Sequence, residues 1–291
     1  MKLCLGTVQF GLRYGIAKND RPEKEECFKI LDCAMANGID TFDTAKAYGE
    51  SEKILCEYFK DKKRSDFKIA TKFEKVTATK EEFVEEVESS LENLGLDYLD
   101  YYLLHKADSV NYPDTMAGLE YIKQKGYIKT AGASVYSPEE AMLALESPYI
   151  DCIQIPYNII DKRFDKYGFF EKAIKYNKTI FCRSMLLQGL FLIDPEKAEE
   201  RVKTSGAVVK TYQDFCSRYG ISPLEMAIGY MKQKKGVDYI VFGVDNLNQL
   251  KEQLELQKII IPEDAVKEAD ELFKDVDDFV LDPRQWNTWG K

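Results

Sequence analysis

The sequence has few of the residues that mark metal centres, disulfide scaffolds and nucleic-acid surfaces. His105 is the only histidine among 291 residues, whereas zinc sites draw mainly on histidine and cysteine. Seven cysteines are dispersed without a C-x-x-C pair, which favours buried free thiols in a reducing compartment. The net charge is −9, and a nucleic-acid surface needs an excess of lysine and arginine. We therefore expect no metal, no disulfide and no nucleic-acid partner.

Long hydrophobic runs are also missing. No stretch approaches the roughly 18 apolar residues of a membrane span. The first residues, MKLCLGTVQFG, include a short apolar patch but no signal-peptide cleavage site. Hydrophobic residues make up 45% and charged residues 31% of the chain, a balance typical of folded globular proteins. We expect a cytoplasmic protein without a membrane partner, and the sequence does not indicate its oligomeric state.

Short β-rich runs alternate with longer amphipathic segments along the whole chain, with no linker between them. Most of the runs are apolar almost throughout, as in parallel strands that are covered on both faces. The runs are residues 3–6, 41–43, 68–72, 98–105, 128–133, 152–155, 179–183 and 239–242. Apolar residues at helical spacing predict helices over residues 23–37, 80–94, 115–125, 138–146 and 248–257.

Eight strands that alternate with helices form either a closed barrel or an open doubly wound sheet. Ser137 and Ser222, each followed by a proline, predict helix starts. Periodicity does not choose between the two architectures. The sequence has no G-x-G-x-x-G turn after a strand, which disfavours a dinucleotide-binding open sheet. The length suits one barrel of about 250 residues with additions, so we predict an α/β fold, a (β/α)8 TIM barrel, as a single domain over residues 1–291.

Four polar residues lie where such a barrel carries chemistry. Asp43 ends the second run, Lys72 the third and His105 the fourth, and Tyr48 follows Asp43 by five residues. Strand ends open onto one face of a barrel, where active sites form. A carbonyl that receives hydride must be protonated, and an ammonium beside a tyrosine stabilises its phenolate and lowers its pKa. A carboxylate would hold the ammonium, and a histidine would orient the carbonyl.

Each of these residues has a structural interpretation when it is taken alone. Asp43 could cap the following helix, and Tyr48 is one of 18 tyrosines. Lys72 could reach solvent from a strand end, and His105 could be a hydrogen-bonded core residue. Their joint occurrence at three consecutive strand ends favours the catalytic interpretation.

The same residues carry a resemblance to the aldo-keto reductase family. The stretch GIDTFDTAKAYG at residues 38–49, with Ser51-Glu52 after it, is similar to the family's first signature; Lys72 in IATKF and His105 in LGLDYLDYYLLH complete a tetrad. Weaker similarity extends over nearly the whole chain. The resemblance implies that Tyr48 is the general acid, that Lys72 and Asp43 tune it, and that His105 orients a carbonyl substrate.

The resemblance also implies a site for NADP or NAD. Ser134 and Gln154 match positions that hold the nicotinamide carboxamide, and Asp43 reaches the ribose. Arg183 stands where many members stack an aromatic ring on nicotinamide; a guanidinium could stack there, or form a salt bridge at the strand end. The remaining expected cofactor residues are Gly6, Thr7, Ser184, Leu186, Gln188, Gly189, Phe242, Gly243, Gln249 and Gln253.

Two regions depart from the family pattern or leave its interpretation open. Asp245 and Gln249 fall in the region where the family usually offers a 2′-phosphate a basic or hydroxyl residue and then an arginine, so we expect weak NADP preference. The tail, about residues 275–291, is expected to pack near the active-site face, where Trp286 and Trp289 either close over substrate or pin the tail. Loops 8–19 and 106–114 are expected to rim the pocket, and tyrosines such as Tyr14 favour a sugar-like carbonyl.

Other functions remain open from the sequence. A cofactor-binding sensor on the same fold would show a broken tetrad, but the tetrad is complete. A redox-neutral enzyme that modifies a sugar would recycle its nicotinamide instead of consuming it.

Overall fold

Eight parallel strands form a closed barrel in the computed structural model, which describes residues 1–16 and 20–286. The strands pair in sequence order, and β8 closes the ring against β1, with Lys2 opposite Tyr239 and Leu5 opposite Phe242. The predicted (β/α)8 barrel is confirmed. The strands are β1 (Lys2–Gly6), β2 (Thr41–Asp43), β3 (Lys68–Phe73), β4 (Leu99–Leu104), β5 (Ile128–Ser134), β6 (Cys152–Pro156), β7 (Thr179–Arg183) and β8 (Tyr239–Phe242).

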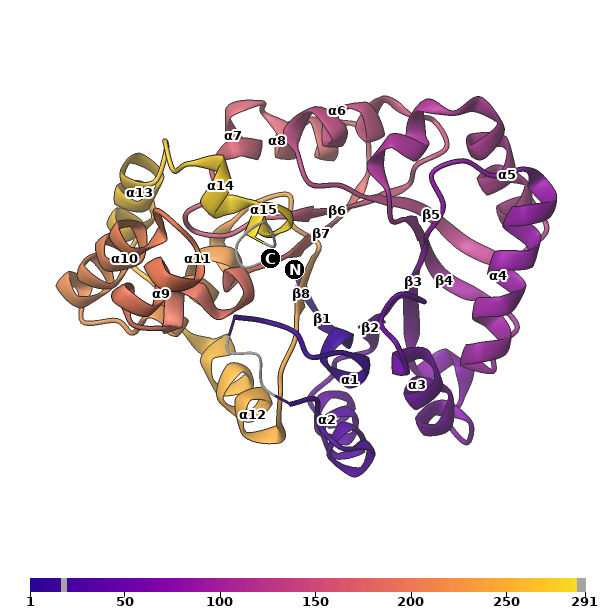
Figure 1. Ribbon diagram of the computed structural model, residues 1–291, viewed down its shortest axis with the longest axis horizontal. Coiled ribbons are helices and arrows are strands. Elements are labelled where there is room, and N and C mark those ends of the chain that lie inside the picture. The colour runs from indigo at the N-terminus through magenta and orange to yellow at the C-terminus, as the bar shows by residue number, and fades with distance from the viewer. Residues whose placement is uncertain (17–19, 287–291) are drawn as a thin grey trace.

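Helices surround the strands, and α9, α10, α11 and α13 gather on one side of the molecule (Figure 1). The helices of the repeating β/α units are α2 (Lys24–Ala36), α3 (Ser51–Phe59), α4 (Lys80–Leu94), α5 (Pro113–Gln124), α6 (Pro138–Glu146), α8 (Phe169–Lys175), α11 (Pro223–Gln233) and α12 (Leu247–Glu255). Additional helices are α1 (Val8–Gly11), α7 (Arg163–Lys166), α9 (Pro195–Arg201), α10 (Ser205–Tyr219), α13 (Glu263–Leu272), α14 (Asp278–Leu281) and α15 (Pro283–Trp286). Short 3₁₀ helices are η1 (Arg64–Asp66), η2 (Ala107–Asn111), η3 (Leu187–Leu192) and η4 (Leu256–Lys258).

Local sequence signals explain where several helices begin. Ser137 accepts a hydrogen bond from the backbone of Glu140, whose side chain bonds back to the serine N–H, and Ser222 makes the same capping box with Glu225. Thr79 opens α4 in the same way, and Gly95 ends that helix with a left-handed φ of 64°. Thr79 and Ser137 thus mark where the loops after β3 and β5 end.

The barrel interior is filled by side chains below the strand C-termini. The Phe181 and Tyr239 rings stack at 4.4 Å between centroids, and the Tyr239 hydroxyl lies 3.3 Å from that of Tyr101. Cys4 and Cys152 belong to the same buried cluster. Because this plug occupies the barrel's lower part, a ligand can enter only from the face at which the strands end.

All seven cysteines are free thiols, as the dispersed pattern indicates. Five of them are buried, but Cys33 and Cys56 are half-buried, so the prediction of buried thiols is wrong for these two. They lie on the outer helices α2 and α3, where solvent reaches part of the helix surface.

Within residues 1–16 and 20–286, no helix combines the length and apolar character that crossing a membrane requires. The same residues contain no cluster of three or more histidine, cysteine or acidic side chains arranged to hold a metal ion.

Candidate active site

A buried ion pair lies at the C-terminal ends of β2 and β3. The Lys72 ammonium donates to Oδ1 of Asp43 at 2.8 Å and to the Thr44 carbonyl oxygen at 2.8 Å. Oδ2 of Asp43 accepts a hydrogen bond from Nε2 of Gln154 at 2.8 Å. Lys72 is 2% exposed and Asp43 3%, so the lysine holds its charge only through these partners. Burial by itself would lower the pKa of Lys72, but Asp43 and Tyr48 outweigh it and raise that pKa.

Asp43 therefore acts through Lys72 and Gln154, and its alternative role as a helix cap is wrong. The helix that follows it, α3, has Glu50 at its N-cap position, seven residues further on.

Tyr48 lies in the loop between β2 and α3, beside this ion pair. The Lys72 nitrogen is 4.8 Å from the centroid of the Tyr48 ring. Burial raises the pKa of the Tyr48 hydroxyl, and the charge of Lys72 opposes this shift without cancelling it. The ammonium lowers the pKa of Tyr48 as expected, but desolvation outweighs this effect, and Tyr48 is a protonated phenol at neutral pH. That is the form a proton donor needs.

His105 follows β4 directly, and its ring lies across from that of Tyr48. The ring centroids are 6.3 Å apart, with an angle of 83° between the planes. Nδ1 of His105 is 2.6 Å from Oε1 of Glu74. Burial would raise the pKa of Glu74, but its hydrogen bond and charge interaction with His105 outweigh burial and lower it. An ionised Glu74 accepts from Nδ1 and fixes the ring's orientation.

Glu74 is a residue that the sequence reasoning missed. Glu74 lies two residues after Lys72, one residue past the end of β3. Side chains at i and i+2 of a strand share a face, so a strand continued by one residue would place Glu74 on the face of Lys72. That spacing is a signal that could have identified it.

A hydroxyl network holds the loop that carries Tyr48. The Thr7 hydroxyl donates to the Asp43 carbonyl oxygen at 2.9 Å and lies 2.7 Å from the Ser51 hydroxyl, which is 2.9 Å from that of Thr44. Glu52 is buried and accepts from the Thr71 hydroxyl at 2.8 Å. The Ser51-Glu52 pair of the sequence motif thus ties α3 to strands β1, β2 and β3.

A cavity of about 370 Å³ opens beside Asp43 and Tyr48. Eleven further predicted cofactor residues line it: Gly6, Thr7, Arg183, Ser184, Leu186, Gln188, Gly189, Phe242, Gly243, Gln249 and Gln253. Tyr14, Met185, Leu192, Ile193 and Leu224 also line it, whereas no residue of loop 106–114 does. Ser134 and Gln154 are not among the residues that line the cavity; Ser134 donates to Oε1 of Gln154 at 3.3 Å, and Gln154 in turn donates to Asp43.

The segment after β7 forms a wall of this cavity in an unusual backbone conformation. Ser184, Leu187 and Gln188 have φ values of 64°, 46° and 58°, which side chains other than glycine rarely adopt, and Gly189 follows with a φ of 89°. The Gln188 carbonyl accepts from the Ile16 N–H at 3.0 Å. Left-handed residues cost about 1–3 kcal/mol each, so the rest of the fold imposes this shape at the cavity.

Comparisons with known proteins agree with this geometry. The model of the Aldo/keto reductase family matches residues 2–274. The chain belongs to this family.

Three proteins similar to this aldo/keto reductase are distant relatives. It is 24% identical to the uncharacterized oxidoreductase YqkF of Bacillus subtilis over 80% of this chain and 82% of that protein. It is 31% identical to the aldo-keto reductase str7 of Strobilurus tenacellus, over 61% of this chain and 54% of str7. It is also 29% identical to the NADH-specific methylglyoxal reductase of Escherichia coli, over 56% of this chain and 57% of that enzyme.

A solved structure supports the fold of this aldo/keto reductase. The thermostable aldo-keto reductase Tm1743, crystallised with the inhibitor epalrestat, superimposes with a TM-score of 0.74 at 24% identity. The match covers 93% of this chain and 94% of the other. At that identity, the likeness shows the shared barrel alone.

The far end of the cavity is lined by acidic and amide side chains, as the sequence indicates. The Asp245 N–H donates to Oε1 of Gln249 at 2.8 Å, and Asn246 caps α12 by accepting from the Gln249 N–H at 3.0 Å. Gln249 thus closes the turn after β8. Asp245, Gln249 and Glu252 all line the cavity, so this end offers carboxylates and amides.

The tail has a structural role in the part that is described. Trp286 is buried and donates from its ring nitrogen to the Phe279 carbonyl oxygen at 2.9 Å, and it does not line the cavity. This pins the tail, as one of the two interpretations expects. Trp289 lies outside the described residues.

Arg183 forms no salt bridge with a described residue, and it stacks on a tyrosine ring. Its guanidinium carbon lies 4.1 Å from the centroid of the Tyr136 ring, and Nη2 donates to the Val135 carbonyl oxygen at 3.2 Å. The salt-bridge interpretation is wrong among the described residues, because the side chain stacks on a tyrosine instead.

Gly11 gives a test of how Tyr48 is positioned. A Cβ atom at Gly11 would lie 1.6 Å from the Tyr48 carbonyl oxygen and 2.9 Å from the Glu50 N–H nitrogen. Backbone atoms cannot yield as a side chain does, so Gly11→Ala must displace the Tyr48 loop. We expect kcat to fall at least tenfold with little change in cofactor Kd. Circular dichroism and thermal unfolding serve as controls for the fold, and wild-type kcat in the variant would contradict this role of Gly11.

Proposed function

We propose that this chain reduces an aldehyde or ketone to an alcohol with a nicotinamide cofactor, and that Tyr48 protonates the carbonyl oxygen. One observation carries the proposal: a protonated tyrosine and a buried lysine–aspartate pair adjoin the same cavity. Membership of the aldo/keto reductase family supports it.

The cavity fits a nicotinamide cofactor. Gly6, Gly15, Gly189 and Gly243 line it, so a flat or extended ligand can approach bare backbone. Its volume lies in the range of small-molecule sites. The imposed left-handed segment at residues 184–189 would hold the pyrophosphate, and Gln253, which is 7% exposed, would face the adenine end.

The tetrad residues divide the proton chemistry between them. A bound reduced nicotinamide would supply the hydride. Tyr48 donates its hydroxyl proton to the carbonyl oxygen as negative charge develops there. The Lys72 ammonium stabilises the resulting phenolate, and Asp43 keeps that ammonium charged and in place. His105, held by Glu74, orients the carbonyl oxygen; its Nε2 can donate only when the imidazole also carries its second proton.

A carbonyl panel tests the proposal. Aldehydes and ketones, including sugar-like ones, are incubated with NADH or NADPH, and cofactor absorbance is followed together with alcohol formation. Stoichiometric cofactor loss and alcohol are the expected result. Product without net cofactor loss would indicate redox-neutral chemistry, and binding without turnover of any carbonyl would indicate a sensor; either outcome contradicts the proposal.

Cofactor preference is a second prediction of the same site. The carboxylates of Asp245 and Glu252 disfavour binding of a 2′-phosphate. Gln249 is uncharged and cannot make the two parallel hydrogen bonds that an arginine makes to a phosphate. We expect Kd values for NADH and NADPH within a hundredfold, in line with a relative that is named NADH-specific. Titration calorimetry measures both constants, and a hundredfold preference for NADPH would contradict this prediction.

Variants sharpen that measurement. Gln249→Arg should tighten NADPH binding about tenfold relative to NADH, because it replaces an amide by a guanidinium at the cavity wall. Gln124→Arg, on the exposed face of α5, adds the same charge far from the cavity and should leave the ratio unchanged.

A further inference from the structure

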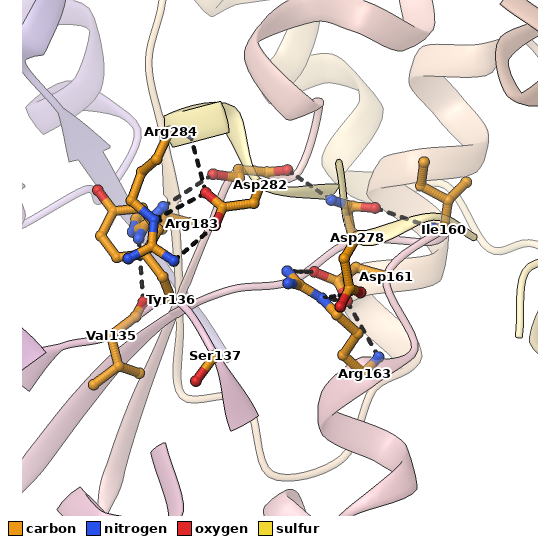
Figure 2. A network of polar contacts seen from close by, with 12 residues as sticks. Val135, Tyr136, Ser137, Ile160, Asp161, Arg163, Arg183, Asp278, Asp282 and Arg284 are labelled. Carbon is orange, nitrogen blue, oxygen red and sulfur yellow. Dashed lines mark hydrogen bonds and ion pairs between the residues drawn. The ribbon is translucent and has the colours of Figure 1, made fainter. Parts of the chain in front are cut away.

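Two arginines stack on Tyr136, one from the barrel and one from the tail (Figure 2). The guanidinium carbons of Arg183 and Arg284 lie 4.1 Å and 4.0 Å from the centroid of its ring. Arg183 ends β7, and Arg284 belongs to α15, so Tyr136 joins the tail to the active-site face. A guanidinium on an aromatic ring keeps its plane and its outward N–H groups in a fixed direction.

The charges of the two arginines are compensated differently. Arg284 donates to both carboxylate oxygens of Asp282, at 3.0 Å from Nε to Oδ1 and 2.7 Å from Nη2 to Oδ2. Arg183 contacts only neutral acceptors besides the ring: the Val135 carbonyl oxygen and, at 3.4 Å, the Ser184 hydroxyl. Within residues 1–16 and 20–286, no carboxylate comes within ion-pair distance of Arg183.

Arg183 also differs in where it lies. It lines the cavity beside Tyr14 and Tyr48, and its charge lowers the pKa of both hydroxyls against a larger, opposite effect of burial. Among the described residues on the cavity wall, Arg183 is the only cation, while Asp43, Asp245 and Glu252 are anionic. Lys72, behind the wall, is already paired with Asp43. The described part of the cavity wall thus has one unpaired positive charge, at the end where Tyr48 lies.

We propose that Arg183 binds the carboxylate of the substrate, and that this reductase acts on oxo acids or aldehyde acids. The inference rests on the proposed carbonyl reduction. A guanidinium forms two parallel hydrogen bonds to a carboxylate. Because the Arg183 guanidinium is already held on the Tyr136 ring, it loses little conformational freedom when a carboxylate binds. A neutral ester offers Arg183 no charge and no paired hydrogen bonds, so the acid should be the preferred substrate.

A matched pair of substrates tests the inference. We expect kcat/KM for 4-carboxybenzaldehyde to exceed that for methyl 4-formylbenzoate at least tenfold, and Arg183→Gln to bring the ratio to about one. Arg218→Gln is the control. This arginine also lies over an aromatic ring, that of Phe215, but it is in the last turn of α10 and does not line the cavity. It should keep the wild-type ratio. Equal rates for acid and ester in the wild type, or an unchanged ratio in Arg183→Gln, would overturn the inference.

Binding measurements separate this inference from the proposed function and from a cofactor role. Benzoate binding to the protein saturated with oxidised cofactor is measured by calorimetry; it should weaken at least tenfold in Arg183→Gln. This readout holds even if the chain reduces no aldehyde, a result that would remove the proposed function but leave Arg183 as a carboxylate-binding residue. If Arg183→Gln instead weakens NADH and NADPH binding tenfold and leaves benzoate binding unchanged, Arg183 serves the cofactor phosphates and the inference is wrong.

Discussion

Tyr48→Phe is expected to lower kcat for carbonyl reduction by about 10³-fold while the protein keeps its fold and its cofactor affinity. General acid catalysis contributes about 10²–10⁴-fold, and this substitution removes only the hydroxyl. The ring stays beside the Lys72 ammonium, which is 4.8 Å from its centroid, and across from the His105 ring. The variant therefore loses the proton without losing the packing.

Tyr14→Phe is the matched control, because Tyr14 lines the same cavity. It should keep kcat within about threefold. The pH profile gives a second check: burial raises the pKa of Tyr48, so the donor is protonated below that pKa and activity declines only as pH rises through it. The basic limb of the wild type should thus lie above the usual tyrosine value of about 10, and Tyr48→Phe should lack it. More than a tenth of wild-type kcat in Tyr48→Phe would contradict the role.

Much of the fold follows from local patterns. The helices at 80–94 and 138–146 have the predicted bounds, because a capping box fixes each start. Strand β3 extends one residue past the prediction, since Phe73 pairs with Leu104 in the ladder, which only the neighbouring strand determines. Helix α10 has no side-chain cap, and its N-cap residue Thr204 has a φ of 66°. No start signal in the sequence marks it.

Part of the candidate site could likewise be predicted from the sequence, and part of it could not. Asp43 and Lys72 could be paired from sequence because neighbouring strand ends meet in a barrel. The approach of Gly11 to Tyr48 could not, since it depends on how two loops pack. Stacking of Arg183 on Tyr136 joins segments that are 47 positions apart in the chain and has no local signature. Tertiary contacts of this kind decide which polar residues stay available to a ligand.

Lys72→Met is expected to remove activity and to destabilise the fold by about 3–5 kcal/mol, the usual cost of leaving one partner of a buried ion pair without its opposite charge. Asp43 is 3% exposed and keeps only the Gln154 amide as a side-chain donor once Lys72 is gone. Urea unfolding at pH 7 measures the loss of stability, and kcat with the best aldehyde measures the loss of catalysis.

The double variant Asp43→Asn/Lys72→Met separates the two effects. Replacing a buried ion pair by neutral groups of similar size is often close to neutral for stability, and the carbonyl oxygen of the introduced amide can still accept from Gln154. We therefore expect the double variant to regain most of the lost unfolding free energy but none of the activity, because no ammonium remains to stabilise the Tyr48 phenolate. Recovery of kcat together with stability would show that Lys72 only supports the fold. Recovery of stability alone assigns the charge of Lys72 to the proton transfer.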